Sequence, residues 1–267
     1  MRIRTLLDQY KAKGKKAFIP FIMAGDHDIV STETLILGLE KIGADIIEIG
    51  VPFSDPVADG ATIIFAGMRA LRNQVNLEEI LSMVKRIRQN GCTIPILLFT
   101  YYNPILALSQ DKFIALAAGA SIDAVLVVDL PEDEGQEFFR ALNVNNIGAV
   151  LLCSPTTSKA RAIANADACT EFLYYIARLG TTGTQDNISS TLASEVAALK
   201  SYIDIPIAVG FGISSKEQAK EIAAIADVCV VGSYLVMEME EADTKLAIEN
   251  LLHKASVVAD AIHDVIL

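Results

Sequence analysis

The chain has 267 residues, of which 52% are hydrophobic, and this is long enough to bury one large core. Its net charge of −11, from 33 acidic and 22 basic residues, argues against a surface that binds nucleic acid or membranes. No apolar run approaches the length of a membrane span, so we expect a soluble, cytoplasmic protein. No flexible linker divides the chain, which favours a single domain over residues 1–267.

Short apolar segments alternate with amphipathic segments eight times along the chain. The apolar segments are nearly continuous in aliphatic residues, which is typical of parallel strands that are buried on both faces. In chain order, the predicted strands are residues 17–23, 46–50, 94–99, 124–128, 149–153, 172–176, 205–209 and 228–231.

Between these strands the spacing of apolar residues predicts helices. The predicted helices are residues 3–13, 32–42, 77–89, 113–118, a helix opened by a capping box at residues 214–217, a short helix at 234–237 and a final helix at 242–265. The first helix precedes the first strand and is expected to plug the floor of the fold. Gly43 suits the position just after a helix end, and Asn76 suits an N-cap.

Eight such units favour an α/β fold of the closed (β/α)8 TIM barrel type. A doubly wound open sheet is the alternative. That fold usually has a G-x-G-x-x-G turn after the first strand, whereas this chain reads Ala24-Gly25-Asp26-His27-Asp28. In a barrel, functional groups gather at the carboxyl ends of the strands, so the polar residues at those ends are the candidates for a site.

Glu48 is a charged residue inside the apolar second strand, and burying a carboxylate is costly unless the group has a use. A structural glutamate that hydrogen-bonds a neighbouring strand is the alternative. The loop that follows supplies a second carboxylate, Asp59, which could return to the same cavity. Two carboxylates in different environments suit acid–base chemistry on a neutral substrate, so this pair is the predicted catalytic centre.

The ends of the last two strands carry glycines, at Gly210, Gly212 and Gly232, and the last is followed by Ser233. Barrels commonly bind phosphate with these two loops and the N-terminus of a short extra helix. Tight turns without a ligand are the alternative. Tyr174, near the end of the sixth strand, could serve either ordinary packing or the site.

The loop from Arg178 to about Ser190 contains few large apolar residues and is predicted to be mobile and to close over the site. The four cysteines show no CxxC spacing, and two of the three histidines lie ten residues apart on the last helix. This pattern suggests neither a disulfide framework nor a metal site, and we expect no metal and no cofactor.

The chain closely resembles the α-subunit of tryptophan synthase. The segment Glu48-Ile49-Gly50-Val51-Pro52-Phe53-Ser54-Asp55-Pro56-Val57-Ala58-Asp59-Gly60 looks like the signature of that family. Further motifs occur in the family's order: Pro20-Phe21, Ala24-Gly25-Asp26, Tyr101-Tyr102-Asn103-Pro104, Asp129-Leu130-Pro131, Gly180-Thr181-Thr182-Gly183, Gly210-Phe211-Gly212-Ile213 and Gly232-Ser233. The resemblance covers essentially the whole chain.

The resemblance implies a lyase that cleaves indole-3-glycerol phosphate to indole and glyceraldehyde 3-phosphate by a retro-aldol reaction. It implies a β-subunit partner in a heterotetramer of two α- and two β-subunits. By position, the family's pattern assigns acid–base catalysis to Glu48 and the contact with the indole N–H to Asp59, with Tyr174 and Thr182 as supporting residues. It assigns phosphate binding to Gly183, Gly212, Gly232 and Ser233. It assigns the lining of the indole pocket to Phe21, Leu126 and Phe211.

The chain departs from the family pattern at Ala61, where proline is usual, at Ile64, where glutamine is usual, and at Thr181, where valine is common. None of these changes removes a group that the chemistry requires. Two other functions remain open: a barrel with weak catalysis that mainly acts as an allosteric subunit, and a different phosphate-barrel isomerase or synthase. The intact pair of Glu48 and Asp59 favours the lyase.

Overall fold

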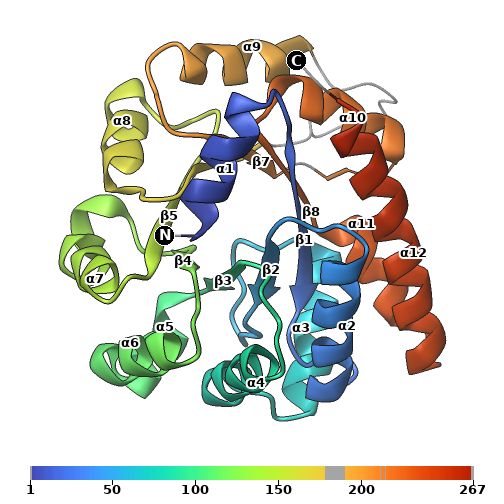
Figure 1. The fold of residues 1–267 in the computed structure, drawn as a ribbon. Coiled ribbons are helices and arrows are strands. Elements are labelled where there is room, and N and C mark those ends of the chain that lie inside the picture. Colours follow the sequence, from blue (N-terminus) through green and yellow to red (C-terminus); the bar gives the residue numbers. More distant parts are fainter. Residues whose placement is uncertain (1, 178–189, 211, 214, 266–267) are drawn as a thin grey trace.

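Eight parallel strands close into a barrel in the computed structural model, which describes residues 2–177, 190–210, 212–213 and 215–265 (Figure 1). Each strand pairs with the next, and β1 also pairs with β8, which closes the sheet. The strands are β1 Ala17–Met23, β2 Ile47–Gly50, β3 Ile96–Thr100, β4 Ala124–Val127, β5 Gly148–Cys153, β6 Leu173–Ile176, β7 Ile207–Gly210 and β8 Val228–Val231. The (β/α)8 prediction is confirmed, and the β1–β8 pairing excludes an open sheet.

The described part of the chain also contains helices, most of which surround the barrel (Figure 1). They are α1 Arg2–Ala12, α2 Ile29–Lys41, α3 Ala61–Arg72, α4 Leu77–Gln89, α5 Tyr102–Leu108, α6 Gln110–Gly119, α7 Glu132–Val144, α8 Lys159–Ala168, α9 Ser190–Lys200, α10 Lys216–Ile225, α11 Ser233–Val236 and α12 Thr244–His263, with a 3₁₀ helix η1 at Met237–Glu240. None of the helices in the described ranges combines the length and the apolar character that a membrane span requires.

Side-chain caps explain where the predicted helix ends are right and where they shift. Asn76 accepts a hydrogen bond from Glu79 N and starts α4 as predicted, and Gly43 follows the end of α2 with a φ of +94°. Helix α2 begins three residues earlier than predicted because Asp28 caps it. The predicted capping box of α10 is one residue out of register, since the N-cap is Ser215.

The hydrophobic residues form two layers, one between the sheet and the outer helices and one inside the barrel. Side chains alternate along each strand, so Leu97 and Leu126 point inwards while Leu98 and Val127 pack outwards. Ile3 of α1 belongs to the interior layer, and α1 lies across the centre of the barrel in Figure 1. The first helix therefore plugs the floor, as the sequence predicts.

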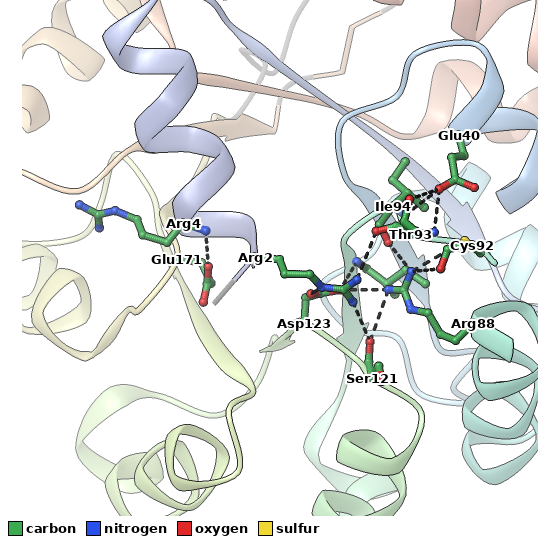
Figure 2. Close-up of polar contacts among 11 residues, drawn as sticks. Arg2, Arg4, Glu40, Arg88, Cys92, Thr93, Ile94, Ser121, Asp123 and Glu171 are labelled. Carbon is green, nitrogen blue, oxygen red and sulfur yellow. Dashed lines mark hydrogen bonds and ion pairs between the residues drawn. The ribbon is translucent and has the colours of Figure 1, made fainter.

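A buried carboxylate, Asp123, joins α1 to the floor of the barrel (Figure 2). Its Oδ1 accepts from Arg2 Nε at 2.6 Å, and its Oδ2 accepts from Arg88 Nη2 at 3.0 Å and from Ile96 N at 2.8 Å. The Asp123 side chain is 4% exposed and that of Arg88 10%. This cluster links α1, α4 and the starts of β3 and β4.

Glu171, which is fully buried before β6, holds the first turn of α1 (Figure 2). Its Oε2 accepts from the backbone N of Arg4 at 2.6 Å. Burial raises the pKa of the Glu171 carboxyl, and the hydrogen bond from the Arg4 amide acts in the opposite direction. A carboxylate at the N-terminus of a helix also interacts favourably with the helix dipole, so this contact orients α1.

We predict that Asp123→Ala lowers the free energy of unfolding by about 3–5 kcal/mol, because it leaves the nearly buried Arg88 guanidinium without its counter-charge. The matched control is Asp133→Ala, which removes an exposed partner of Arg161 and should change stability by less than about 0.5 kcal/mol. Urea unfolding followed by circular dichroism measures both. Equal effects of the two substitutions would contradict a structural role for the Asp123 cluster.

Candidate active site

A cavity of about 350 Å³ opens at the carboxyl ends of the strands. It brings together both predicted catalytic carboxylates, the predicted Tyr174 and three of the four predicted phosphate-binding residues. Its lining residues are Phe21, Glu48, Ala58, Asp59, Gly60, Ile63, Phe99, Tyr174, Ile176, Ala177, Gly210, Gly212, Val230, Gly232 and Ser233.

Glu48 lies on β2 between Phe21 of β1 and Leu97 of β3, and its side chain reaches the cavity. It is 1% exposed, and its Oε1 has no hydrogen-bond partner among the residues that the structure describes. Burial raises the pKa of Glu48 to about 8, the nearby Tyr174 hydroxyl opposes that rise, and the charge of Asp59 adds to it. At neutral pH the Glu48 carboxyl therefore holds a proton that it can donate.

Asp59 lies on the loop after β2 and is less buried than Glu48. Burial raises its pKa to about 6, and a hydrogen bond from Tyr101 limits the rise, so Asp59 is mainly ionised at neutral pH. Tyr101 also holds the loop itself, since its hydroxyl accepts from Ala58 N at 3.0 Å and its ring packs on Phe53. The two carboxyls thus have different protonation states in one cavity, as an acid–base site requires.

The glycines at the ends of the last two strands, Gly210, Gly212 and Gly232, allow other groups to pack closely against the backbone. A Cβ at Gly210 would lie 2.8 Å from the Tyr174 hydroxyl, so only glycine leaves room for that side chain. Gly212 and Gly232 line the cavity, and Ser233 starts the short helix α11. Backbone N–H groups and a serine hydroxyl are donors that suit an anion.

The walls of the cavity are mainly apolar. The rings of Phe21 and Phe99 meet edge to face with their centres 5.6 Å apart, and Ile63 of α3 adds a further wall. Neither Phe99 nor Ile63 is among the site residues predicted from the sequence. The position of Phe99 at the end of a predicted strand could have indicated it, whereas Ile63 reaches the cavity only through the packing of α3.

Leu126 is not among the residues that line the cavity. It is fully buried in the interior layer of the barrel, together with Tyr174. Three other candidate residues, Thr182, Gly183 and Phe211, lie outside the described residues, as does most of the predicted mobile loop.

A closed (β/α)8 barrel with a protonated and an ionised carboxyl in one largely apolar cavity defines a barrel enzyme equipped for acid–base chemistry. A model of the family "Tryptophan synthase alpha chain" matches residues 7–264. The chain belongs to this family.

Individual relatives agree with this assignment. The chain is 43% identical over 240 residues to the tryptophan synthase alpha chain of Geotalea uraniireducens, with 90% of each chain covered. The structure of tryptophan synthase subunit alpha from Legionella pneumophila superposes with a TM-score of 0.90 at 33% identity, covering 98% of both chains. A tryptophan synthase structure from M. tuberculosis, in the aminoacrylate- and BRD0059-bound form, gives 0.87 at 30% identity, also covering 98% of both chains.

The known reaction of the family is the cleavage of indole-3-glycerol phosphate, so the chain is a lyase of tryptophan biosynthesis. This confirms the function that the sequence predicts.

The raised pKa of Glu48 predicts a dependence of stability on pH. The folded state keeps a proton that the unfolded chain releases near the ordinary value of 4.5, so stability falls as pH rises from about 4.5 to about 8. Glu48→Gln cannot ionise and escapes this loss. Its stability relative to the unsubstituted protein should therefore increase by roughly 1–3 kcal/mol between pH 6 and pH 9.

Urea unfolding at the two pH values measures the difference. The control is Glu137→Gln, which makes the same substitution on the exposed face of α7. A constant difference for Glu48→Gln would show that Glu48 ionises normally in the folded state.

Proposed function

We propose that Glu48 is the acid–base residue of the cleavage and that Asp59 stabilises the charge on the indole ring. The observation that carries the proposal is that Oε1 of the buried Glu48 has no hydrogen-bond partner among the described residues and lies in the cavity that also holds Asp59. A hydrogen-bonding group that is buried without a protein partner is costly, and a substrate that meets it explains its retention.

The proton movements balance with Glu48 alone. The protonated carboxyl donates to C3 of the indole, and positive charge develops on the ring nitrogen, where the Asp59 carboxylate stabilises it through the N–H. The Glu48 carboxylate then takes the proton of the adjacent glycerol hydroxyl. The oxygen forms the aldehyde C=O, the bond to C3 breaks, and its electron pair restores the aromatic indole. Glu48 ends protonated, as it began.

The rest of the cavity fits the two ends of the substrate. Gly212, Gly232 and Ser233, together with Gly183, would bind the phosphate through backbone N–H groups and a hydroxyl. Phe21 and Phe211 would flank the indole, and Leu126 would support the pocket from below. Tyr174 would orient Glu48, and Thr182 would contact the site from its loop.

We further propose that a β-subunit binds the rim formed by residues 52–56 and 103–104, in a heterotetramer. Support comes from the alpha-chain family and from exposed apolar side chains beside this rim, with Val57 87% and Leu106 51% exposed. Indole released at the carboxyl ends of the strands would then leave towards the partner. A cytoplasmic location is supported by four cysteines that are free and buried, as in a reducing compartment.

Glu48→Gln should reduce the rate of indole-3-glycerol phosphate cleavage by about 10²–10⁴-fold, because glutamine keeps the volume but cannot exchange a proton. Asp59→Asn should also be severely impaired through loss of charge. Formation of indole measures both, with Glu137→Gln as the control that keeps the normal rate. Near-normal cleavage by Glu48→Gln would disprove the mechanism. Absence of cleavage by the unsubstituted chain, with or without a β-subunit, would instead favour a purely allosteric subunit.

Leu106→Glu should weaken binding of a cognate β-subunit at least about tenfold, because it places a charge in an apolar part of the proposed interface. The control is Val144→Glu, which puts the same charge on another exposed residue, at the end of α7 and away from the rim. Size-exclusion chromatography and calorimetry measure complex formation. Equal binding of both variants would place the interface elsewhere, and no complex with the unsubstituted chain would remove the proposal.

A further inference from the structure

Asp26 is a further buried carboxylate, which lies outside the cavity on the loop between β1 and α2. Its side chain is 2% exposed and is paired with Arg69 of α3. The pairing is bidentate, with Arg69 Nε 2.6 Å from Oδ1 and Nη2 2.8 Å from Oδ2. Buried ion pairs of this kind often add little net stability, because desolvation offsets the attraction. The pair therefore matters more through the geometry that it imposes on Asp26 and Arg69 than through its contribution to the free energy of unfolding.

Helix α3 connects this ion pair to the cavity. It begins at Ala61, directly after Asp59 and Gly60, and its first turn contributes Ile63 to the cavity wall. Its N-cap, Gly60, has no side chain and makes no side-chain cap hydrogen bond. Tyr101 holds the residue before Asp59, and contacts made further along α3 hold the helix that follows.

Helix α3 packs on β1 and α11 through Ala66 and Ala70, and it also makes polar contacts with the β1–α2 loop that carries Asp26. Asn73, at the C-terminal end of α3, donates through Nδ2 to the carbonyl of Gly25 at 3.2 Å and to the carbonyl of His27. Together with the Arg69–Asp26 pair, they attach the C-terminal half of α3 to the β1–α2 loop by four hydrogen bonds that span residues 25–27.

The loop is itself fixed on its other side. His27 Nε2 donates to the carbonyl of Met239 at 3.0 Å, and His27 Nδ1 forms a hydrogen bond with the Thr244 hydroxyl, also at 3.0 Å. Met239 belongs to η1, which continues directly from α11 and Ser233. The loop therefore joins α3 on the Asp59 side of the cavity to the segment that follows Ser233 on the other side.

We propose that Asp26 and Arg69 are positioning residues, which hold α3 against the β1–α2 loop and thereby set the place of Asp59 in the cavity. This inference rests on the proposed function of Asp59. Arg69 lies about 12 Å along the helix axis from Ala61, at about 1.5 Å per residue. A tilt of about 5° around that anchor moves the start of α3 by about 1 Å, and a misplacement of that size can cost about 10²-fold in rate.

The test compares Arg69→Met and Arg69→Lys with Arg86→Met. Arg86 lies on α4 and forms an exposed ion pair with Glu33, so the same loss of charge there should leave kcat unchanged. Arg69→Met should lower kcat about 10–100-fold with KM changed less than about threefold. Arg69→Lys keeps the charge but loses the bidentate geometry, and its loss should be smaller. All rates are measured on protein shown to be folded by circular dichroism, and Arg69→Lys carries the test if Arg69→Met does not fold.

Combination with Asp59→Asn separates positioning from general damage. If Arg69 acts through Asp59, adding Arg69→Met or Arg69→Lys to Asp59→Asn should reduce the residual rate less than twofold. Equal fold-losses in the two backgrounds would overturn the proposal, as would a kcat within twofold of normal for both folded Arg69 variants. If the unsubstituted protein cleaves the substrate and Glu48→Gln does not, such results would refute the positioning role alone and leave the proposed function intact.

Discussion

Phe21, Glu48 and Leu97 lie side by side on three hydrogen-bonded strands, and this register places a carboxyl inside a closed barrel where water cannot solvate it. The remaining features of the candidate site depend on that desolvation. It raises the pKa of Glu48 to about 8, so that a glutamate is protonated at neutral pH. It also strengthens the interaction of Glu48 with Asp59, because charges interact more strongly where water is excluded.

The two carboxyls of the cavity differ because their supports differ. Glu48 is on a strand of the closed barrel, whereas Asp59 is on a loop that Tyr101 holds and that continues into α3. The strand position buries the Glu48 carboxyl fully. The loop position leaves the Asp59 carboxyl partly exposed, with a pKa of about 6. One cavity thus contains an acid and an ionised group.

The two ends of the barrel have different roles: the floor contributes to stability, and the carboxyl ends of the strands form the candidate site. At the floor, the buried carboxylates have charged and backbone partners: Asp123 pairs with Arg2 and Arg88, and Asp45 with His263 and the backbone N of Phe18. At the opposite end, Glu48 Oε1 has no hydrogen-bond partner among the described residues. This division is general in TIM barrels, where the carboxyl ends of the strands carry the function and the amino ends carry stability. The Asp26–Arg69 pair is an exception, since it is a structural ion pair at the functional end.

The local sequence determined the positions of the strands and many of the residues that meet in the cavity. Strands β1 and β8 have their predicted bounds, and the other strands differ by at most two residues, because continuous aliphatic runs mark strands buried on both faces. Glu48, Asp59, Tyr174, Gly212, Gly232 and Ser233 were predicted and meet in one cavity, since the carboxyl ends of parallel strands share one edge.

Only the tertiary structure decided which neighbours these residues have. Leu126, which was predicted for the indole pocket, belongs to the interior layer of the barrel and is not among the residues that line the cavity, because the layer that a strand residue occupies depends on the register of the closed barrel. Ile63 reaches the cavity, and Arg69 reaches Asp26, only through the docking of α3 across the sequence. Periodicity specifies which face of an element is buried, but the burial, protonation and partners of a carboxyl depend on contacts between elements that are distant in the chain.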